Sequence, residues 1–157
     1  IAPTTVPGEY GFGDVAYERT SFADREQSNE WVGTAAALWG ITAGVYMALM
    51  GPQGFVEIGE GILQRSRYAM TRIAKIKGVR CPVLASVHFK EFVVNFDGAG
   101  KTVAEINEAL LEQGIFGGKD LTNEFPALGN SALYCVTEVH TQQDMDRLAN
   151  TLAEVVK

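Results

Sequence analysis

The chain has 157 residues, of which 46% are hydrophobic, and it carries a formal net charge of −6. This length favours one domain with a substantial core, and the apolar content excludes an intrinsically disordered chain. The acidic balance, with no basic stripe, argues against binding to nucleic acid or to an anionic membrane surface.

The first residues lack a sustained hydrophobic period and contain proline, glycine and acidic residues. We predict an extended arm over residues 1–24, with a short extended piece at Asp14–Tyr17, and one folded domain over residues 25–157. The segment shows none of the features of a signal peptide. Because the chain begins with Ile1, we expect it to be a processed or truncated part of a longer protein.

Trp31–Met50 contains no charged residue. Its length suits a membrane span, and Gly40 with Gly44 forms a GxxxG pair. The favoured interpretation is instead a helix buried in a larger protein. It is the only such segment, no basic cluster flanks it, and small residues recur every four positions from Ala36 to Ala48, so that another backbone can approach one face. This helix therefore predicts an interface.

Gly51–Pro52 ends the apolar helix, and Pro52 suits the first turn of a second one. Gln53–Lys77 is predicted to be that helix, with Gly78 as its stop. Apolar residues at three-to-four spacing give its buried face, namely Phe55, Ile58, Ile62, Ala69, Ile73 and Ile76.

The second half of the chain alternates strand-like and helical segments. A short strand is predicted at Arg80–Leu84, where Pro82 restricts it to an edge. The main strand is predicted at Val87–Phe96 and a second one at Ala132–Val139, after a loop at Asn123–Asn130.

Capping boxes mark the start of two helices in this half. Thr102 with Glu105 begins a helix that Gly114 ends, and Thr141 with Asp144 begins the last helix. The predicted buried faces are Val103, Ile106 and Leu110 in the first and Met145, Leu148, Leu152 and Val155 or Val156 in the second. Two long helices followed by a β-α-β-α unit predict an α+β fold, with helices on one face of a small sheet.

Few residues indicate chemistry by themselves. Cys81 and Cys135 lie in apolar contexts and are interpreted as reduced core thiols, with a disulfide or a reactive thiol as the alternatives. His88 and His140 lack partners at a zinc-ligand spacing, so no metal site is predicted. The glycines of Gly114–Gly118 favour tight turns over an anion site.

Charged and polar residues at strand ends are the candidate site residues, because sites are built where strands meet loops. Lys90 and Glu91 are neighbours on the main strand and point to opposite faces, so one is expected to be exposed and the other paired or in a cleft. Thr137 and Glu138 end the second strand, where a plain surface carboxylate is the favoured interpretation of Glu138.

Several short motifs follow one another along the chain in a specific order. They are Arg25–Glu26 before the apolar helix, VYMALMG at Val45–Gly51, GPQG at Gly51–Gly54, KEFVV at Lys90–Val94, GIFGG at Gly114–Gly118 and CVTE at Cys135–Glu138. In this order and spacing they resemble the glycine-cleavage P-protein, the pyridoxal-phosphate-dependent glycine decarboxylase, and in particular the C-terminal portion of subunit 1 of its two-subunit form. The resemblance runs from about Arg19 to Lys157.

One departure accompanies the resemblance. After the Arg-Glu pair the family usually has a Thr-Ser-Asn run that helps to line the active-site region, whereas here the positions are Asn29-Glu30-Trp31. Contacts that this region makes with cofactor or substrate in relatives are therefore not expected to be the same.

The resemblance implies the small C-terminal domain of a fold-type-I pyridoxal-phosphate enzyme. Such an enzyme holds its cofactor through a lysine in the large domain, and no lysine here precedes the apolar helix. The implied cofactor, pyridoxal phosphate, is thus bound mainly outside this chain, which carries no catalytic, aldimine or metal-binding residue. Candidates for a cleft wall or interface are Arg25, Glu26, Lys90, Glu91, Thr137 and Glu138.

The implied holoenzyme decarboxylates glycine and passes an aminomethyl group to a lipoyl carrier protein. Its implied partners are that carrier and the cofactor-bearing subunit 2, in a cytoplasmic oligomer, and the chain alone is expected to be inactive. Two alternatives stay open: a free-standing, non-catalytic α+β binding or regulatory module, and a single-span membrane protein, which is disfavoured by the features of the apolar helix given above.

Overall fold

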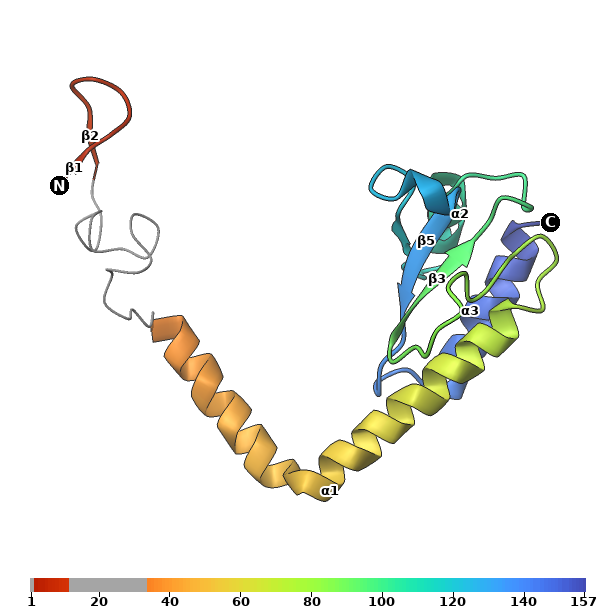
Figure 1. The fold of residues 1–157 in the computed structure, drawn as a ribbon, viewed down its shortest axis with the longest axis horizontal. Helices are drawn as coiled ribbons and strands as arrows, with labels where there is room; N and C mark the ends of the chain where they lie inside the picture. The colour runs from red at the N-terminus through yellow and green to blue at the C-terminus, as the bar shows by residue number, and fades with distance from the viewer. Residues whose placement is uncertain (1, 12–33) are drawn as a thin grey trace. The chain divides into compact units, whose positions relative to one another are not determined.

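The computed structural model describes residues 2–11 and 34–157, and the chain divides into two compact units, Ile1–Gly51 and Pro52–Lys157 (Figure 1). In the first unit β1 (Ala2–Pro3) and β2 (Tyr10–Gly11) form an antiparallel hairpin. The predicted boundary of the arm at residue 24 and the extended piece at Asp14–Tyr17 lie outside the described residues and stay predictions.

The helix α1 (Thr34–Ile73) consists of two helices joined at Gly51, whose backbone is non-helical with φ 61° and ψ 177°. This conformation suits glycine, which has no Cβ to clash at positive φ. Pro52 begins the second helix, where its missing N–H costs no hydrogen bond. The predicted break at Gly51–Pro52 is therefore confirmed, whereas Trp31, the predicted start of the first helix, lies outside the described residues.

The second part of α1 ends at Ile73, four residues before the predicted end at Lys77. The chain leaves the helix through tighter turns, in which Lys75 N donates to Arg72 O and Ile76 N donates to Ile73 O. Gly78, the predicted stop, has φ 83° and follows these turns.

Unit Pro52–Lys157 contains a three-stranded sheet of β3 (Glu91–Asn95), β4 (Lys119–Asp120) and β5 (Ser131–Cys135), in the order β3-β5-β4 and antiparallel throughout. The strands predicted at Val87–Phe96 and Ala132–Val139 are confirmed in shorter form as β3 and β5. The strand β4 was not predicted, because two residues give no alternation to detect. Arg80–Leu84 is not a strand: it makes one isolated bridge, between Arg80 and Asn95, and Pro82 offers no N–H to extend it.

Two capped helices follow in chain order, α2 (Val103–Glu112) and α3 (Gln142–Val155). Both capping boxes are complete: Thr102 and Thr141 each accept from the N3 backbone, while Glu105 and Asp144 each accept from the N-cap backbone. The predicted loop Asn123–Asn130 contains a short 3₁₀ turn, η2 (Pro126–Leu128).

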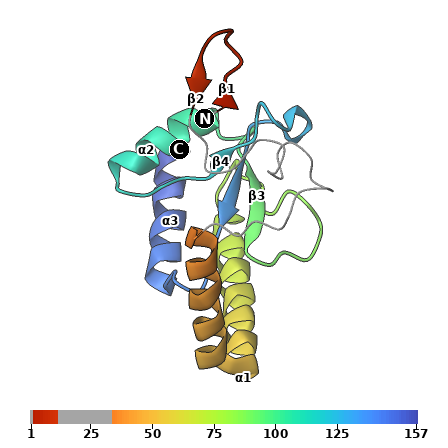
Figure 2. The ribbon, with the colours of Figure 1, turned by 90° about the vertical axis from the view of Figure 1, so that its left-hand side faces the viewer.

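The core lies between one face of this sheet and the second part of α1, α2 and α3 (Figure 2). Alternate residues of the sheet segments point into it, namely Phe92, Val94, Phe96, Ala132, Tyr134 and Val136. The helices and the residue after the last one contribute residues that were predicted, Ala69, Ile73, Val103, Ile106, Leu110, Met145, Leu152 and Val156, and one that was not, Ala149. The predicted α+β layout with helices on one face is therefore confirmed. Phe55, predicted to be buried, is exposed.

Candidate functional site

One end of the sheet gathers the described candidate residues. Because β3 and β5 are antiparallel, the start of one lies beside the end of the other, and Val136 N donates to Lys90 O at 2.8 Å. This sheet-end site contains Lys90, Glu91, Thr137 and Glu138. Arg25 and Glu26 lie outside the described residues, as does Asn29-Glu30-Trp31, so these candidates stay predictions.

Lys90 immediately precedes β3 and Glu91 is its first residue. Both side chains are exposed. The alternation of the strand directs Phe92 into the core, which leaves Glu91 on the opposite face of the sheet. The prediction was that one neighbour is exposed and the other is paired or lies in a cleft. Both are exposed and no ion pair joins either to another described residue, so the pairing is not found and the cleft contact stays a prediction.

A turn after β5 holds His140 against Thr137. Thr137 N donates to His140 Nδ1 at 3.0 Å, and His140 N donates to Thr137 O at 3.3 Å. Because a backbone N–H only donates, Nδ1 is the acceptor, and a neutral ring carries its proton on Nε2. His140 is thus a positioned ring at the sheet end with Nε2 as its donor.

Arg65 reaches the same turn from α1, since its Nε donates to His140 O at 3.0 Å. Its guanidinium lies over Gly61, where an added Cβ would be 2.7 Å from Nη1. The side chain is half-buried and has no carboxylate within ion-pair distance among the described residues. An arginine fixed in this way keeps N–H donors for an anionic oxygen.

A cavity of about 460 Å³ lies beside this arginine, lined by residues of α1 and of the start of α3, including Tyr68 and Thr141. Asp144 lies near this cavity in the capping box, where hydrogen bonds from Thr141 hold the pKa of its carboxyl below the usual value. The sheet end therefore combines an available guanidinium, the Thr141 hydroxyl at the start of α3 and the exposed Lys90 and Glu138. Such a set can bind and orient a polar ligand.

Arg65 was not identified from the sequence. His140 was considered only as a metal ligand, and no metal site was predicted there. Their contact joins positions 75 apart in the chain, so no local pattern reports it. The one local signal is the i, i+4 spacing of Gly61 and Arg65, which places a long side chain over a residue without a Cβ.

The cysteine interpretation is half right. Cys81 is buried, and burial raises the pKa of its thiol to about 12. Cys135 is exposed, which corrects the prediction that it is a core thiol. The physical reason is strand parity, because Tyr134 points into the core and its neighbour must point away. Both thiols are free.

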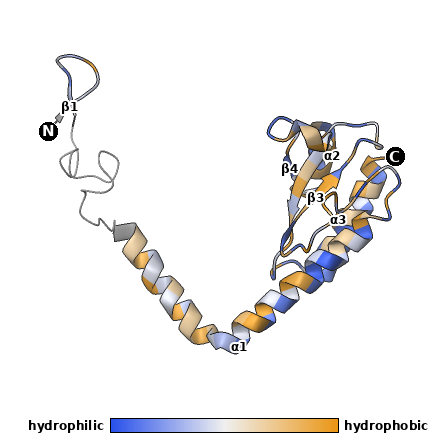
Figure 3. Ribbon diagram, in the orientation of Figure 1, coloured by the Kyte–Doolittle hydropathy of each residue, from blue (hydrophilic) through white to orange (hydrophobic). Residues whose placement is uncertain are grey.

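The helical segment 36–50 is apolar over much of its length (Figure 3). Many of its large side chains are exposed. Trp39 is 73% exposed and Leu49 is 80% exposed, and Leu38, Ile41, Val45 and Met47 are exposed as well. Contiguous apolar surface of this kind marks an interaction site. None of the helices in the described part of the chain has the length and hydropathy of a membrane-spanning segment. Within residues 2–11 and 34–157, no three His, Cys, Asp or Glu side chains cluster as metal ligands do.

Comparison with known proteins finds relatives over most of the chain. No family model matches it. Curated proteins that match include several named probable glycine dehydrogenase (decarboxylating) subunit 1. That of Staphylothermus marinus is 38% identical over 97% of this chain, that of Coxiella burnetii 34% over 94%, and that of Desulforamulus reducens 33% over 96%. The chain spans about a third of the length of these relatives (32%, 32% and 33%).

Solved structures agree with these matches. An inhibitor-bound crystal structure of glycine decarboxylase, the P-protein of the glycine cleavage system, superimposes with a TM-score of 0.72 and 26% identity, over 88% of this chain and 30% of that one. A C-DES variant with glycine covalently linked to its PLP cofactor gives a TM-score of 0.53 at 17% identity, over 62% of this chain and 24% of that one, and so shares the fold. Over nearly its whole length the chain is therefore homologous to about a third of glycine dehydrogenase (decarboxylating) subunit 1, and it has a fold found within fold-type-I pyridoxal-phosphate enzymes.

Proposed function

We propose that this chain is the C-terminal domain of subunit 1 of a pyridoxal-phosphate-dependent glycine decarboxylase. The parent enzyme removes the carboxylate of glycine and transfers the aminomethyl group to a lipoyl carrier protein in the cytoplasm. The observation that carries the proposal is the agreement of sequence and structure, with 38% identity to a subunit 1 and a TM-score of 0.72 to a glycine decarboxylase.

The residues of this chain do not fit the role of holding the cofactor. An aldimine lysine needs an environment that lowers its charge, such as a desolvated pocket. All six lysines of the sequence are exposed, namely Lys75, Lys77, Lys90, Lys101, Lys119 and Lys157. We therefore assign pyridoxal phosphate to protein outside this chain, in subunit 2, and we assign no chemical step to a residue described here.

The role of the domain in this proposal is to form contacts. The exposed apolar segment 36–50 packs against other parts of the assembled enzyme, and this supports an oligomer. The sheet-end site, with Arg65 and His140, forms part of a polar cleft wall. A free-standing regulatory module is the less favoured alternative, because a small independent domain has little surface with which to bury Trp39 and Leu49.

Glycine carboxyl exchange tests the function. The full-length parent is mixed with its cofactor-bearing partner and a lipoyl carrier, and labelled bicarbonate is followed into the carboxyl group of glycine. We expect exchange that requires both subunits. Absence of exchange, with both proteins folded and the partner loaded with cofactor, would refute the decarboxylase assignment.

The cleft role of the sheet end is tested in the same assay with Arg65→Gln. If the guanidinium orients a polar ligand, a small misplacement lowers exchange by roughly tenfold to a hundredfold. Lys119→Gln is the matched control, because it also removes one positive charge, from an exposed ion pair with Glu124 at 2.7 Å on another edge of the sheet. Equal exchange in the two variants would reject the cleft role and leave the decarboxylase assignment untouched.

A further inference from the structure

We propose that a second cavity, between the end of α1 and the last turns of α3, binds a small multivalent anion whose charged groups are phosphates or carboxylates. The cavity lies wholly in the unit Pro52–Lys157 and is separate from the sheet-end site. It is called the basic cavity here. No part of the decarboxylase assignment depends on it.

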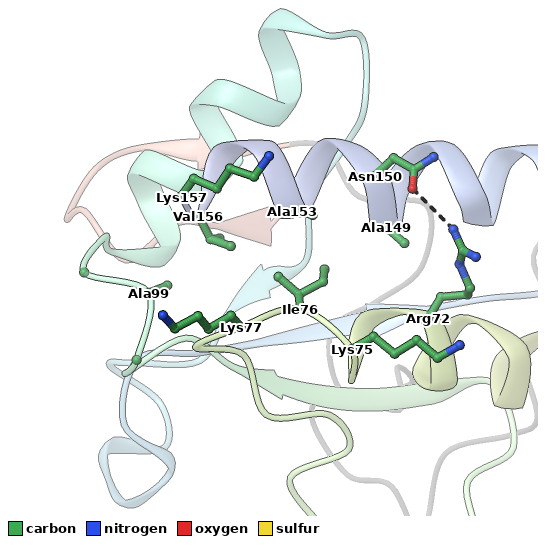
Figure 4. A pocket seen from close by; sticks show the side chains of 12 residues that line it. Arg72, Lys75, Ile76, Lys77, Ala99, Ala149, Asn150, Ala153, Val156 and Lys157 are labelled. Carbon is green, nitrogen blue, oxygen red and sulfur yellow. Dashed lines mark hydrogen bonds between the residues drawn. The ribbon is translucent and has the colours of Figure 1, made fainter.

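The walls of the basic cavity come from three parts of the chain that meet in space. The turns after α1 form one wall, α3 forms the opposite wall, and the Gly98–Gly100 turn closes one end (Figure 4). Ile76 is directed toward α3, and together with Val156 it gives the cavity an apolar floor. Its volume of about 780 Å³ lies in the range of small-molecule sites.

The position of the turn depends on a close backbone approach. A Cβ on Gly78 would lie 2.4 Å from Gly98 O, and a Cβ on Gly98 would lie 2.8 Å from Gly78 O. Only glycine at both positions lets the two segments meet, and the approach keeps the end wall free of large side chains.

The charge of the lining is opposite to that of the chain. Acidic residues outnumber Lys and Arg by 19 to 13 overall, yet no Asp or Glu lines this cavity. Four cations do: Arg72, Lys75, Lys77 and Lys157. The Lys75 and Lys77 side chains extend toward opposite ends of the cavity, so the positive charge is spread along it (Figure 4). Like charges along one concave surface raise the local concentration of anions.

The arginine of the set is fixed and the lysines are available. Arg72 Nε lies 3.1 Å from Asp146 Oδ1, and its Nη2 donates to Asn150 Oδ1 at 3.3 Å (Figure 4). Lys75, Lys77 and Lys157 are exposed and form no ion pair with any residue that the structure describes. The uncompensated positive charge therefore resides on the three lysines.

A simpler explanation is that these lysines only complement the negative ends of two helices. Several carbonyls at those ends, however, already have donors. At the end of α1, Met70 O, Arg72 O and Ile73 O accept from the backbone, and at the end of α3, Leu152 O accepts from Val156 N and Val155 O accepts from Lys101 Nζ. These five carbonyls do not require the ammonium groups of the three lysines.

The lining also limits the class of ligand. Lysine acts as a flexible point charge, which suits phosphate or carboxylate groups. Three ammonium groups on separate stems match a ligand with more than one charged group. No aromatic side chain lines the cavity to stack on a base, so the lining disfavours a nucleotide.

Calorimetric titration of the full-length protein tests the site, with pyrophosphate as the phosphate probe, tricarballylate as the carboxylate probe and acetate as the monovalent reference, all at one ionic strength. We expect saturable binding of at least one multivalent probe, and the tighter of the two identifies the chemical class. In the double variant Lys75→Gln with Lys77→Gln we expect affinity to fall by about tenfold or more, because each contact is a charge pair near the surface.

Arg67→Gln with Lys119→Gln is the matched control, since it removes two exposed cations that do not line the basic cavity. It should bind the probes as the unaltered protein does. An equal loss in both double variants would show a general charge effect and overturn the proposal. Binding of acetate as tight as that of the multivalent probes, or no saturable binding in the unaltered protein, would overturn it as well.

Discussion

Ser66 Oγ donates a hydrogen bond of 2.6 Å to Phe89 O and so joins α1 to the segment that leads into β3. Ser66 is fully buried, in a helix whose other buried residues are apolar. A buried hydroxyl is tolerated when it is hydrogen-bonded. This contact therefore fixes where the chain enters the sheet, one residue before Lys90 of the sheet-end site.

Ser66→Ala should loosen this entry. Phe89 O would lose its donor, and the loss of one hydrogen bond of this kind costs about 0.5–1.5 kcal/mol. Hydrogen exchange of the β3 peptide, measured by mass spectrometry in the full-length protein, should show faster exchange than in the unaltered protein. Ser86→Ala, at an exposed position, is the control and should leave the exchange rate unchanged. Unchanged protection of β3 in Ser66→Ala would mean that the bond carries no net stability.

Acidification should weaken the start of α3 before the core is affected. Hydrogen bonds from Thr141 lower the pKa of the Asp144 carboxyl below its usual value. A carboxyl whose folded pKa is depressed stabilises the folded state above its unfolded pKa, and the contribution is lost as pH falls through the folded pKa. Protection of the first turn of α3 should thus decline below about pH 4.

The variant Asp144→Asn is the check on this pH dependence. It removes the titrating group, so the first turn of α3 should be less protected at neutral pH and should change less between pH 5 and pH 2.5. Glu105, whose pKa is also lowered, chiefly by hydrogen bonds from Thr102, remains in this variant, and α2 should keep its own acid dependence. An identical acid response of α3 in both proteins would contradict the assignment to Asp144.

Gly78→Ala should be strongly destabilising. The residue has φ 83°, and the new Cβ would meet Gly98 O at 2.4 Å. Strain of this kind costs about 1–3 kcal/mol, and the backbone clash adds to it. The melting temperature of the full-length protein should fall. Gly59→Ala is the matched control, because an added Cβ there meets no atom within 4 Å and alanine favours the helix, so its melting temperature should not fall.

Native-state alkylation should distinguish the two thiols. Cys135 is exposed, whereas burial raises the pKa of Cys81 to about 12 and also blocks access. Because the thiolate is the reacting form, iodoacetamide at pH 8 should modify Cys135 rapidly and Cys81 only after unfolding. Peptide mass spectrometry of the full-length protein measures both sites in one sample. Equal modification rates in the native protein would contradict the burial of Cys81.

Local signals predicted the elements that local interactions form. The capping boxes at Thr102 and Thr141 join residues three positions apart, and both were identified correctly. The break at Gly51 was likewise predictable, because a following proline disfavours the helical conformation and glycine can adopt a positive φ. Periodicity alone predicted only an α+β fold. The motifs that resemble the glycine-cleavage P-protein predicted the more specific fold.

Features that depend on distant contacts were not predictable. Arg65 gains its place from His140, and β4 exists only because Lys119–Asp120 pairs with β5. The error at Cys135 was avoidable in principle. Cys135 follows Tyr134 on the same strand, so the two side chains point to opposite faces of the sheet. Of the two, the large aromatic side chain is the better candidate for the buried face.

Arg80–Leu84, which was predicted to be a strand and is not one, covers the edge of β3 that faces away from β5. Along β3 the odd-numbered residues point their backbone groups away from β5, toward what would otherwise be an open edge. Arg80 exchanges two 3.0 Å hydrogen bonds with Asn95 there, and Val83 N donates to Val93 O at 3.0 Å. Between them Pro82 has no N–H to continue a ladder. A β-strand from another molecule would have to displace these bonds before it could pair with β3, so this crossing protects the β3 edge from edge-to-edge aggregation.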